Sequence, residues 1–398
     1  MPDAPPAAMP MNRRFPLLVL LFAGFVLIGV PTVIVGPILP TFISRWSLND
    51  SQAGLFFTVQ FAASLAGVWL TTALTAWRGY RPGLVIGYIL TGIGLASLNA
   101  PTRALALTAT AAFGLGYGFV TPPTNLSAAE AGGKNSAGLV SLLNFAWGIG
   151  AVACSPLIMF ALRRRFLPAL LLWLGIAACA LAASFRLVSF PSDRKSGAAD
   201  SAINAAGQKA NTIPSLGITV AVTALFFLYV GTEASIGGWA AEHTKRLARH
   251  PNALSTIAPM FFYGGIMAGR AAAIWILARI REIRVITGAL MLAIVGVTAL
   301  IAAPSQIVAV CGLGVAGLGA ASIYPLYISW FSRWYGNVAR KLGGLVFSMA
   351  SLGGSALPWL VGGLSMSAAS LRIGLLVPLA ACLVMASLVT VVHRRGLV

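Results

Sequence analysis

Long apolar runs alternate with short polar segments along all 398 residues of the chain. A helix needs about 20 mostly apolar residues to cross the hydrocarbon core of a bilayer. Twelve runs come close to that length or exceed it, so the pattern predicts an all-α membrane protein with twelve transmembrane helices. The predicted spans are residues 15–44, 52–76, 83–99, 104–128, 137–161, 167–189, 214–240, 253–278, 285–303, 306–330, 342–365 and 372–392.

The longest polar stretch, residues 191–212, separates the sixth run from the seventh. Its Ser, Ala, Asn and charged residues are typical of a flexible linker. We therefore expect two six-helix halves, 15–190 and 213–393, with terminal tails at 1–14 and 394–398. The halves echo each other, because "FGLGYGFVTPPTN" in the fourth run corresponds to "CGLGVAGLGAASIYP" in the tenth. Such duplication is common in secondary transporters, whose substrate site lies near the bilayer midplane.

The composition excludes a soluble globular protein. The chain is 58% hydrophobic and 9% charged, whereas a soluble domain has about 25% charged residues. The four cysteines lie inside apolar runs without metal-binding or redox spacing, so we expect them to pack and we expect no metal or cofactor. The run that starts at Phe15 is longer than a signal-peptide core and follows no cleavage site, so the first span is predicted to stay uncleaved.

The net charge of +19 follows the membrane topology. Seventeen Lys and Arg residues fall in the loops on the side of the termini, nine fall in the opposite loops, and Arg270 lies inside a span. Positive residues favour the cytoplasmic side, so both termini are predicted to be cytoplasmic, in a bacterial inner membrane. The cluster Arg163–Arg165 contradicts this rule without explanation. Because the charges form short clusters between spans, we expect no nucleic-acid partner.

Several local motifs resemble the major facilitator superfamily over nearly the whole chain. They are "GPILPTF" and "SLNDSQAGLFF" around the first loop, "TALTAWRGYRPGL" after the second span, and "GLGAASIYPLYIS" and "SLGGSALPWLVGG" near the end. The third motif keeps Gly79 and Arg81, but Ala76 stands where the family has an acidic residue. The resemblance implies the major facilitator fold and transport by alternating access.

Two segments are similar to the branch of fucose permease and the glucose/mannose symporters, which carries sugars with protons. They are "LYVGTEASIGGW" in the seventh span and "LLNFAWGIGA" in the fifth, where Asn144 stands at a position that is usually a polar amide. Fucose permease has acidic residues in spans 1 and 4. Here span 1 has none, and Thr121 stands at the matching position in span 4, so coupling by that route is not supported.

Glu233 is the main candidate for the transport chemistry. A carboxylate inside a span costs about 3 kcal/mol on insertion scales, so it should face a cavity or a partner. Tyr229 lies one helical turn earlier on the same face. A carboxylate accepts hydrogen bonds from sugar hydroxyls, and an aromatic ring covers the apolar face of a sugar. Glu233 is therefore a candidate for substrate binding and for proton coupling, with a structural hydrogen bond as the alternative.

Three glycines near Glu233 have two interpretations. Gly231, Gly237 and Gly238 weaken a helix, and the seventh span could therefore bend over a substrate. They could equally allow close helix packing.

Further polar residues inside the spans could bind a neutral polyol. Amides and phenols offer directional hydrogen bonds, although each could also serve a helix–helix contact. These further substrate-site candidates are Gln60, Asn125, Asn144, Trp147, Tyr324 and Tyr327.

Charged residues near the predicted inner surface could form a gate. Family resemblance implies a contact between Glu130 and Arg78 or Arg81, with a solvated helix end as the alternative. Arg270 is predicted to be a gating or structural residue in the inner half of its span, and a pair with Glu233 is a less favoured option.

These features together predict a secondary active transporter that moves a small polar solute, with a sugar favoured and proton coupling left open. The alternative is a major facilitator exporter of drugs or metabolites. A membrane enzyme or sensor is a distant third, because the three histidines lie outside the predicted spans and no catalytic motif is present. The expected partners are the solute, protons and the lipid bilayer, and we expect a monomer.

Overall fold

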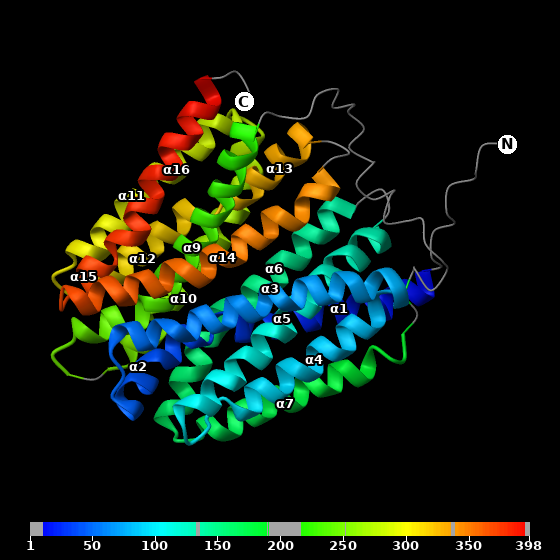
Figure 1. Ribbon diagram of the computed structural model, residues 1–398, viewed down its shortest axis with the longest axis horizontal. Helices are drawn as coiled ribbons and strands as arrows, with labels where there is room; N and C mark the ends of the chain where they lie inside the picture. Colours follow the sequence, from blue (N-terminus) through cyan, green and yellow to red (C-terminus); the bar gives the residue numbers. More distant parts are fainter. Residues whose placement is uncertain are drawn as a thin grey trace. The chain divides into compact units, whose positions relative to one another are not determined.

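The computed structural model describes residues 11–132, 136–188, 190, 216–250, 252–335 and 339–394. Regular structure within these ranges is entirely helical (Figure 1). The predicted linker at 191–212 lies outside the described residues, as do residues 1–10 and 395–398 of the predicted tails.

Every predicted span corresponds to one helix or to two consecutive helices. The helices are α1 (Met11–Val33), α2 (Val35–Trp46), α3 (Asp50–Arg78), α4 (Tyr80–Ser97), α5 (Arg103–Gly132), α6 (Ser136–Arg163), α7 (Leu167–Ser184), α9 (Leu216–Arg246), α10 (Ala253–Leu277), α11 (Glu282–Ala302), α12 (Gln306–Ala320), α13 (Ile323–Tyr335), α14 (Ala339–Ser367), α15 (Leu371–Gly374) and α16 (Leu376–Arg394). The predicted all-helical membrane fold is therefore confirmed.

The number of spanning helices agrees closely with the prediction. Among the described residues, eleven helical segments are long and apolar enough to cross a membrane. The one predicted span outside these eleven is 83–99, which corresponds to α4. This helix has 18 residues and begins with the less apolar turn Tyr80, Arg81 and Pro82. This polar turn lowers the apolar character of a short helix, and α4 is not among the eleven segments.

The first predicted span is interrupted between α1 and α2. The interruption lies at Ile34, between Pro31 and Pro37. Proline lacks an N–H group, so each of these residues removes one hydrogen bond from the helical ladder. The side chain of Gln60 donates a hydrogen bond to the carbonyl oxygen of Thr32 over 2.8 Å and thereby stabilises the interruption.

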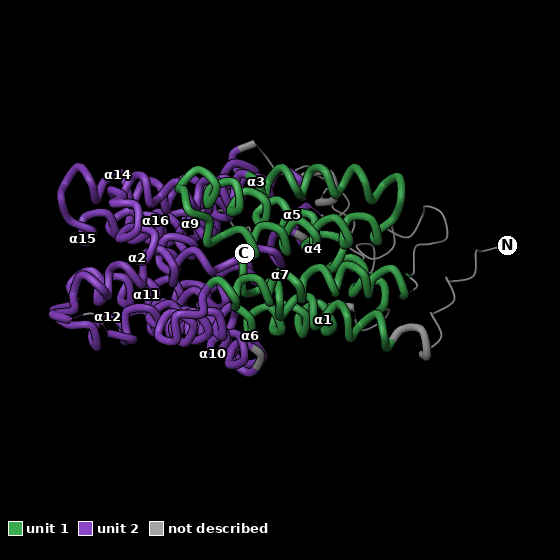
Figure 2. Tube along the Cα trace, turned by 90° about the horizontal axis from the view of Figure 1, so that it is seen from below, with its two compact units in different colours: residues 1–31, 63–150, 168–206 green, residues 32–62, 151–167, 207–398 purple. Residues whose placement is uncertain are grey.

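The chain forms two compact units (Figure 2). Unit 1 comprises residues 1–31, 63–150 and 168–206, and unit 2 comprises residues 32–62, 151–167 and 207–398. These boundaries cut through α3 and α6 and do not coincide with the sequence halves. The division into two six-helix halves stays a prediction.

Unit 1 has an apolar core in which α4 and α5 lie very close together. Tyr88 of α4 stacks on Phe185, with ring centroids 5.5 Å apart. A Cβ atom added to Gly94 of α4 would lie 2.5 Å from the backbone nitrogen of Phe113 in α5. Small residues at such contacts allow two membrane helices to approach each other.

Unit 2 is organised around α9, which packs against α2, α10, α14 and α16. The contact between α9 and α14 is close, because a Cβ atom on Gly231 would lie 2.7 Å from the carbonyl oxygen of Gly353. The contact between α2 and α9 is equally close, because a Cβ atom on Gly36 would lie 2.8 Å from the carbonyl oxygen of Gly237. The residues around Glu233 are therefore held in a tightly packed framework.

Candidate functional site

The helix that carries Glu233 is continuous. α9 runs unbroken from Leu216 to Arg246, so the predicted bend at its glycines is not observed. Gly237 instead faces the hydroxyl of Tyr263, and a Cβ atom on Gly238 would lie 2.6 Å from the ring of Phe57. The glycines of this span therefore serve close packing, which was the alternative interpretation.

Aromatic side chains from α9 and α13 meet one turn below Glu233. The ring centroid of Tyr229 lies 5.5 Å from that of Tyr324 and 6.5 Å from that of Tyr327. Phe226 packs on the same two tyrosines at 5.6 Å and 6.0 Å. The structure thus brings together three of the predicted substrate-site residues, which lie about 95 residues apart in the sequence.

Glu233 adjoins this aromatic group. Its carboxyl group adjoins the hydroxyl of Tyr229, and the charge of Arg270 acts on it. The same hydroxyl lies 3.2 Å from the carbonyl oxygen of Ala320. Glu233 is partly exposed, so helix packing does not seal it. We refer to Phe226, Tyr229, Glu233, Arg270, Tyr324 and Tyr327 as the Glu233 cluster.

Two members of the Glu233 cluster have unused hydrogen-bonding atoms. Among the described residues, the hydroxyl of Tyr327 and the Nε atom of Arg270 are buried without a hydrogen-bond partner. Tyr327 itself is only 2% exposed. Leaving a buried polar group unsatisfied costs roughly 1–3 kcal/mol. Such atoms are therefore well suited to bind a polar group of a solute.

The predicted amide ligands are engaged with backbone atoms. Gln60 is buried and bonds Thr32 as described above, which agrees with the alternative of a structural hydrogen bond. Asn125 donates to the carbonyl oxygen of Thr121 over 2.9 Å. Asn125 keeps its side-chain oxygen for other contacts, and its place in the substrate site stays a prediction.

Asn144 and Trp147 have different surroundings in α6. Asn144 is exposed and donates to the carbonyl oxygen of Val140 over 2.8 Å. Trp147 is partly buried and packs against the core of unit 1. The packing supports a structural contribution from Trp147, and the assignment of both residues to the substrate site stays a prediction.

Two of the predicted gating residues, Glu130 near the end of α5 and Arg81 at the start of α4, have hydrogen-bond partners in unit 1. Glu130 accepts a hydrogen bond of 2.5 Å from the hydroxyl of Tyr80. Arg81 donates to the carbonyl oxygen of Val188 over 3.0 Å, and Arg78 is exposed. The partner that the structure gives Glu130 is thus a tyrosine, and gating by Glu130, Arg78 and Arg81 stays a prediction.

A charged cluster at the C-terminal end of α9 was missed by the sequence analysis. Arg246 donates to both oxygens of Asp50, over 2.9 Å and 2.5 Å. Its Nε atom donates to Glu242 over 2.9 Å, and Ser365 donates to Asp50 over 2.5 Å. We refer to Asp50, Glu242, Arg246 and Ser365 as the Arg246 cluster.

The Arg246 cluster connects the start of α3 with the ends of α9 and α14, all within unit 2. The carboxylate side chains are 10% and 5% exposed, whereas that of Arg246 is 37% exposed. Nearby, Lys245 reaches from α9 to α2 and donates to the hydroxyl of Ser44 over 3.0 Å. The sequence did contain one local signal, because Glu242 and Arg246 have the i, i+4 spacing of a helical ion pair.

One prediction about histidine was wrong because α9 is longer than expected. The histidines are predicted to lie outside the spans, but α9 continues to Arg246 and α16 to Arg394, so His243 and His393 both lie in helices, and His243 is buried. Its Nε2 atom lies 2.9 Å from the carbonyl oxygen of Leu300 in α11 and donates to it. His243 therefore connects two helices.

Solved structures similar to this chain are membrane transporters of low sequence identity. A variant of the E. coli fucose:proton symporter is 16% identical, with 95% of this chain and 99% of that chain covered and a TM-score of 0.63. The E. coli xylose transporter, in a partially occluded inward-open state, is also 16% identical, covers 96% and 98% and has a TM-score of 0.73.

A bacterial homologue of the human lysosomal transporter Spinster, in an inward-facing unoccupied state, is 15% identical, covers 97% and 98% and has a TM-score of 0.74. No curated protein matches the sequence. At sequence identities of 15–16%, the similarity to these solved structures shows the fold alone.

The sequence model of the Major Facilitator Superfamily matches residues 21–316, which is more than half of the chain. The chain therefore belongs to the major facilitator superfamily.

Proposed function

We propose that this multi-pass membrane transporter moves a small polar solute, most simply a sugar, by alternating access, and that Glu233 carries the coupled proton. The observation that carries the proposal is the arrangement of Glu233 beside tyrosine rings and the unpartnered hydroxyl of Tyr327. Similar solved structures include a fucose:proton and a D-xylose:proton symporter, which supports the same solute class.

The chemistry of the Glu233 cluster suits a neutral polyol. Aromatic rings can cover the apolar face of a sugar, and the phenol hydroxyls and the carboxyl group can exchange hydrogen bonds with sugar hydroxyls. A protonated Glu233 donates a hydrogen bond, whereas an ionised Glu233 accepts hydrogen bonds and is attracted to Arg270. The protonation state of this single group thereby changes what the site offers to a solute.

We further propose that the Arg246 cluster closes the predicted outer end of the transport pathway. It connects Asp50 in the predicted N-terminal half with Arg246 and Ser365 in the predicted C-terminal half. Opening that end requires these charge-assisted hydrogen bonds to break. The substrate, on binding, would have to compensate for their loss, because a ligand shifts an equilibrium only through its differential affinity for the two states.

Reconstitution of the purified protein into proteoliposomes tests the proposal. We expect one or more sugars in a panel to exchange in a counterflow assay, in which no proton gradient is needed. We expect Glu233→Gln to retain counterflow but to lose uptake driven by an imposed proton gradient. A Gly264→Ala variant serves as the control, since a Cβ atom there meets nothing within 4 Å.

Two results would overturn parts of the proposal. If no sugar exchanges and a lipophilic drug does, the solute class is wrong and the exporter alternative is supported. If Glu233→Gln retains full proton-driven uptake, Glu233 is not the coupling residue.

A further inference from the structure

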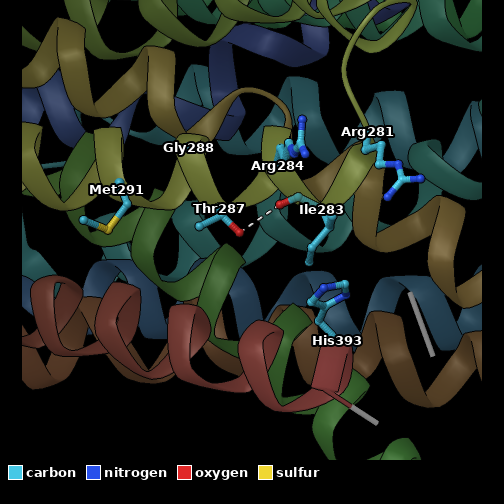
Figure 3. Close-up of a pocket in the computed structure, with 7 residues that line it drawn as sticks. All are labelled: Arg281, Ile283, Arg284, Thr287, Gly288, Met291 and His393. Carbon is cyan, nitrogen blue, oxygen red and sulfur yellow. Dashed lines mark hydrogen bonds between the residues drawn. The ribbon is translucent and has the colours of Figure 1, made fainter. Parts of the chain in front are cut away.

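A cavity of about 450 Å³ lies between the N-terminal end of α11 and the C-terminal end of α16. Figure 3 shows Arg281 and Arg284 at the first turn of α11, with His393 reaching toward that helix from α16. Thr287, Gly288 and Met291 continue the lining along α11. The cavity belongs to unit 2, and its lining shares no residue with either cluster described above.

The two arginines of this cavity have no carboxylate partner within the part of the chain that the structure describes. Neither forms an ion pair among the described residues. The adjacent carboxylate, Glu282, is already bonded to the indole of Trp330 over 2.9 Å and to Arg333 over 3.0 Å. The cavity lining therefore contains two positive charges and no carboxylate.

The position of these arginines at the start of a helix favours binding of an anion. The N-terminus of a helix carries a partial positive charge, which repels cations and attracts phosphates and other anions. Arg281 precedes α11 directly, and Arg284 lies in its first turn. Both side chains are exposed, so they can reach a ligand. An anionic group in the cavity would balance the two guanidinium groups and the helix end together.

An apolar stripe leads away from the arginines along α11. Gly288, Met291 and Val295 follow Arg284 at helical spacing, and Met291 and Val295 are more than half exposed. A Cβ atom on Gly288 meets nothing within 4 Å, so this glycine leaves open space that helix packing does not require. The surface is thus cationic at the membrane boundary and apolar along the membrane-facing helix.

We propose that this cavity binds an anionic phospholipid, with the headgroup phosphate at Arg281 and Arg284 and an acyl chain along Gly288, Met291 and Val295. Basic pockets between membrane helices are suited to such headgroups. Arginine binds phosphate oxygens in a bidentate manner. The apolar stripe favours a phospholipid over free phosphate, because free phosphate would use only the cationic part of the site.

Native mass spectrometry of the full-length protein in detergent tests this site. The probes are phosphatidylglycerol, cardiolipin, zwitterionic phosphatidylcholine and inorganic phosphate. We expect retention of the two anionic lipids. The double variant Arg281→Gln/Arg284→Gln should bind them roughly 25-fold more weakly, because each basic residue near a membrane surface contributes about 1 kcal/mol and 1.4 kcal/mol corresponds to a factor of ten.

Two further variants separate the site from general effects. Gly288→Trp keeps both arginines but fills the cavity, and we expect it to weaken lipid retention as well. Arg279→Gln removes an exposed charge that does not line the cavity, and we expect it to retain the lipid. Equal loss in Arg279→Gln, equal retention of phosphatidylcholine, or arginine-dependent binding of inorganic phosphate that displaces the lipid would each overturn the proposal.

Discussion

The Arg246 cluster and the Glu233 cluster both place carboxylates and an arginine in unit 2, but they treat the charges differently. In the Arg246 cluster, one guanidinium group donates to two carboxylates, and Ser365 donates to an Asp50 oxygen that also accepts from Arg246. Among the described residues, only the Oε2 atom of Glu242 in this cluster is buried without a hydrogen-bond partner. In the Glu233 cluster, the positive charge of Arg270 acts on Glu233 electrostatically. The Nε atom of Arg270 has no hydrogen-bond partner among the described residues.

This difference indicates that the Arg246 cluster is a structural contact and that the Glu233 cluster is a binding site. Directly paired charges at a helix end stabilise one arrangement of α3, α9 and α14, because breaking a buried pair leaves an uncompensated charge. Incompletely paired groups reduce stability and remain available for a ligand. Proteins commonly accept such a loss of stability at functional sites. The following substitutions should therefore change stability by different amounts, and one should change it in the opposite direction.

The largest loss is expected for Arg246→Met. This substitution leaves the carboxylates of Asp50 and Glu242 without their cation, at an expected cost of about 3 kcal/mol in unfolding free energy. Thermal unfolding of the purified protein in detergent measures the effect. Arg249→Met is the matched control, since Arg249 lies one turn further and is exposed. Equal losses in the two variants would show that the Arg246 cluster is not a specific contact.

A smaller loss is expected for Gly36→Ala, which tests the packing of α2 against α9. The added Cβ atom would lie 2.8 Å from the carbonyl oxygen of Gly237 and 3.3 Å from the Cα atom of Gly238. Backbone atoms cannot rotate away, so we expect a cost of about 2 kcal/mol. Gly264→Ala, which meets open space, should be neutral or stabilising by up to about 1 kcal/mol. Thermal unfolding again distinguishes the two variants. If Gly36→Ala leaves the unfolding temperature unchanged, the close approach of α2 and α9 is contradicted.

The opposite sign is expected for Glu233→Gln. Replacing a mid-membrane carboxyl group by a neutral amide removes the unfavourable burial of charge, and we expect a gain of about 1 kcal/mol. Asp50→Asn should instead lower the unfolding temperature, because it weakens the pair with Arg246. Both variants replace an acid by its amide, so each controls for the other. A loss of stability in Glu233→Gln as large as that in Asp50→Asn would mean that Glu233 is chiefly structural.

The smallest effects are expected at the tyrosines of the Glu233 cluster. Tyr229→Phe removes a hydroxyl that has protein partners and should cost about 1 kcal/mol. Tyr327→Phe removes an unpartnered hydroxyl and should leave the unfolding temperature unchanged or slightly raised. We expect Tyr327→Phe to weaken solute binding instead, which a substrate-induced thermal shift measures. If stability falls equally in both variants, the hydroxyl of Tyr327 has a structural partner.

Much of the fold could be predicted because membrane insertion imposes a simple length rule. Each run of apolar residues became a helix, and even the short run at 83–99 corresponds to α4. Tyr229 and Glu233 could be connected by helical periodicity alone, since four residues make about one turn. Tyr324 and Tyr327 were identified by residue type, but their contact with α9 depends on tertiary packing.

The Arg246 cluster illustrates what the sequence does not reveal. Asp50 and Arg246 are 196 residues apart, and each lies next to a predicted loop, where a charge normally needs no partner. The end of α9 was also placed six residues too early, because the polar residues His243, Lys245 and Arg246 ended the apolar run. The end of a helix that is stabilised by tertiary ion pairs cannot be located from the hydropathy of the sequence.

The separation of Asp50 and Arg246 has a consequence for biosynthesis. A ribosome that adds about 5–20 residues per second needs roughly 10–40 s to proceed from Asp50 to Arg246, and Ser365 lies 315 residues after Asp50. During this interval the nascent chain exposes an unpaired aspartate at a membrane boundary. The late-made helices α9 and α14 therefore complete a contact that the earliest helices cannot form, and newly made molecules become resistant to unfolding only near the end of translation.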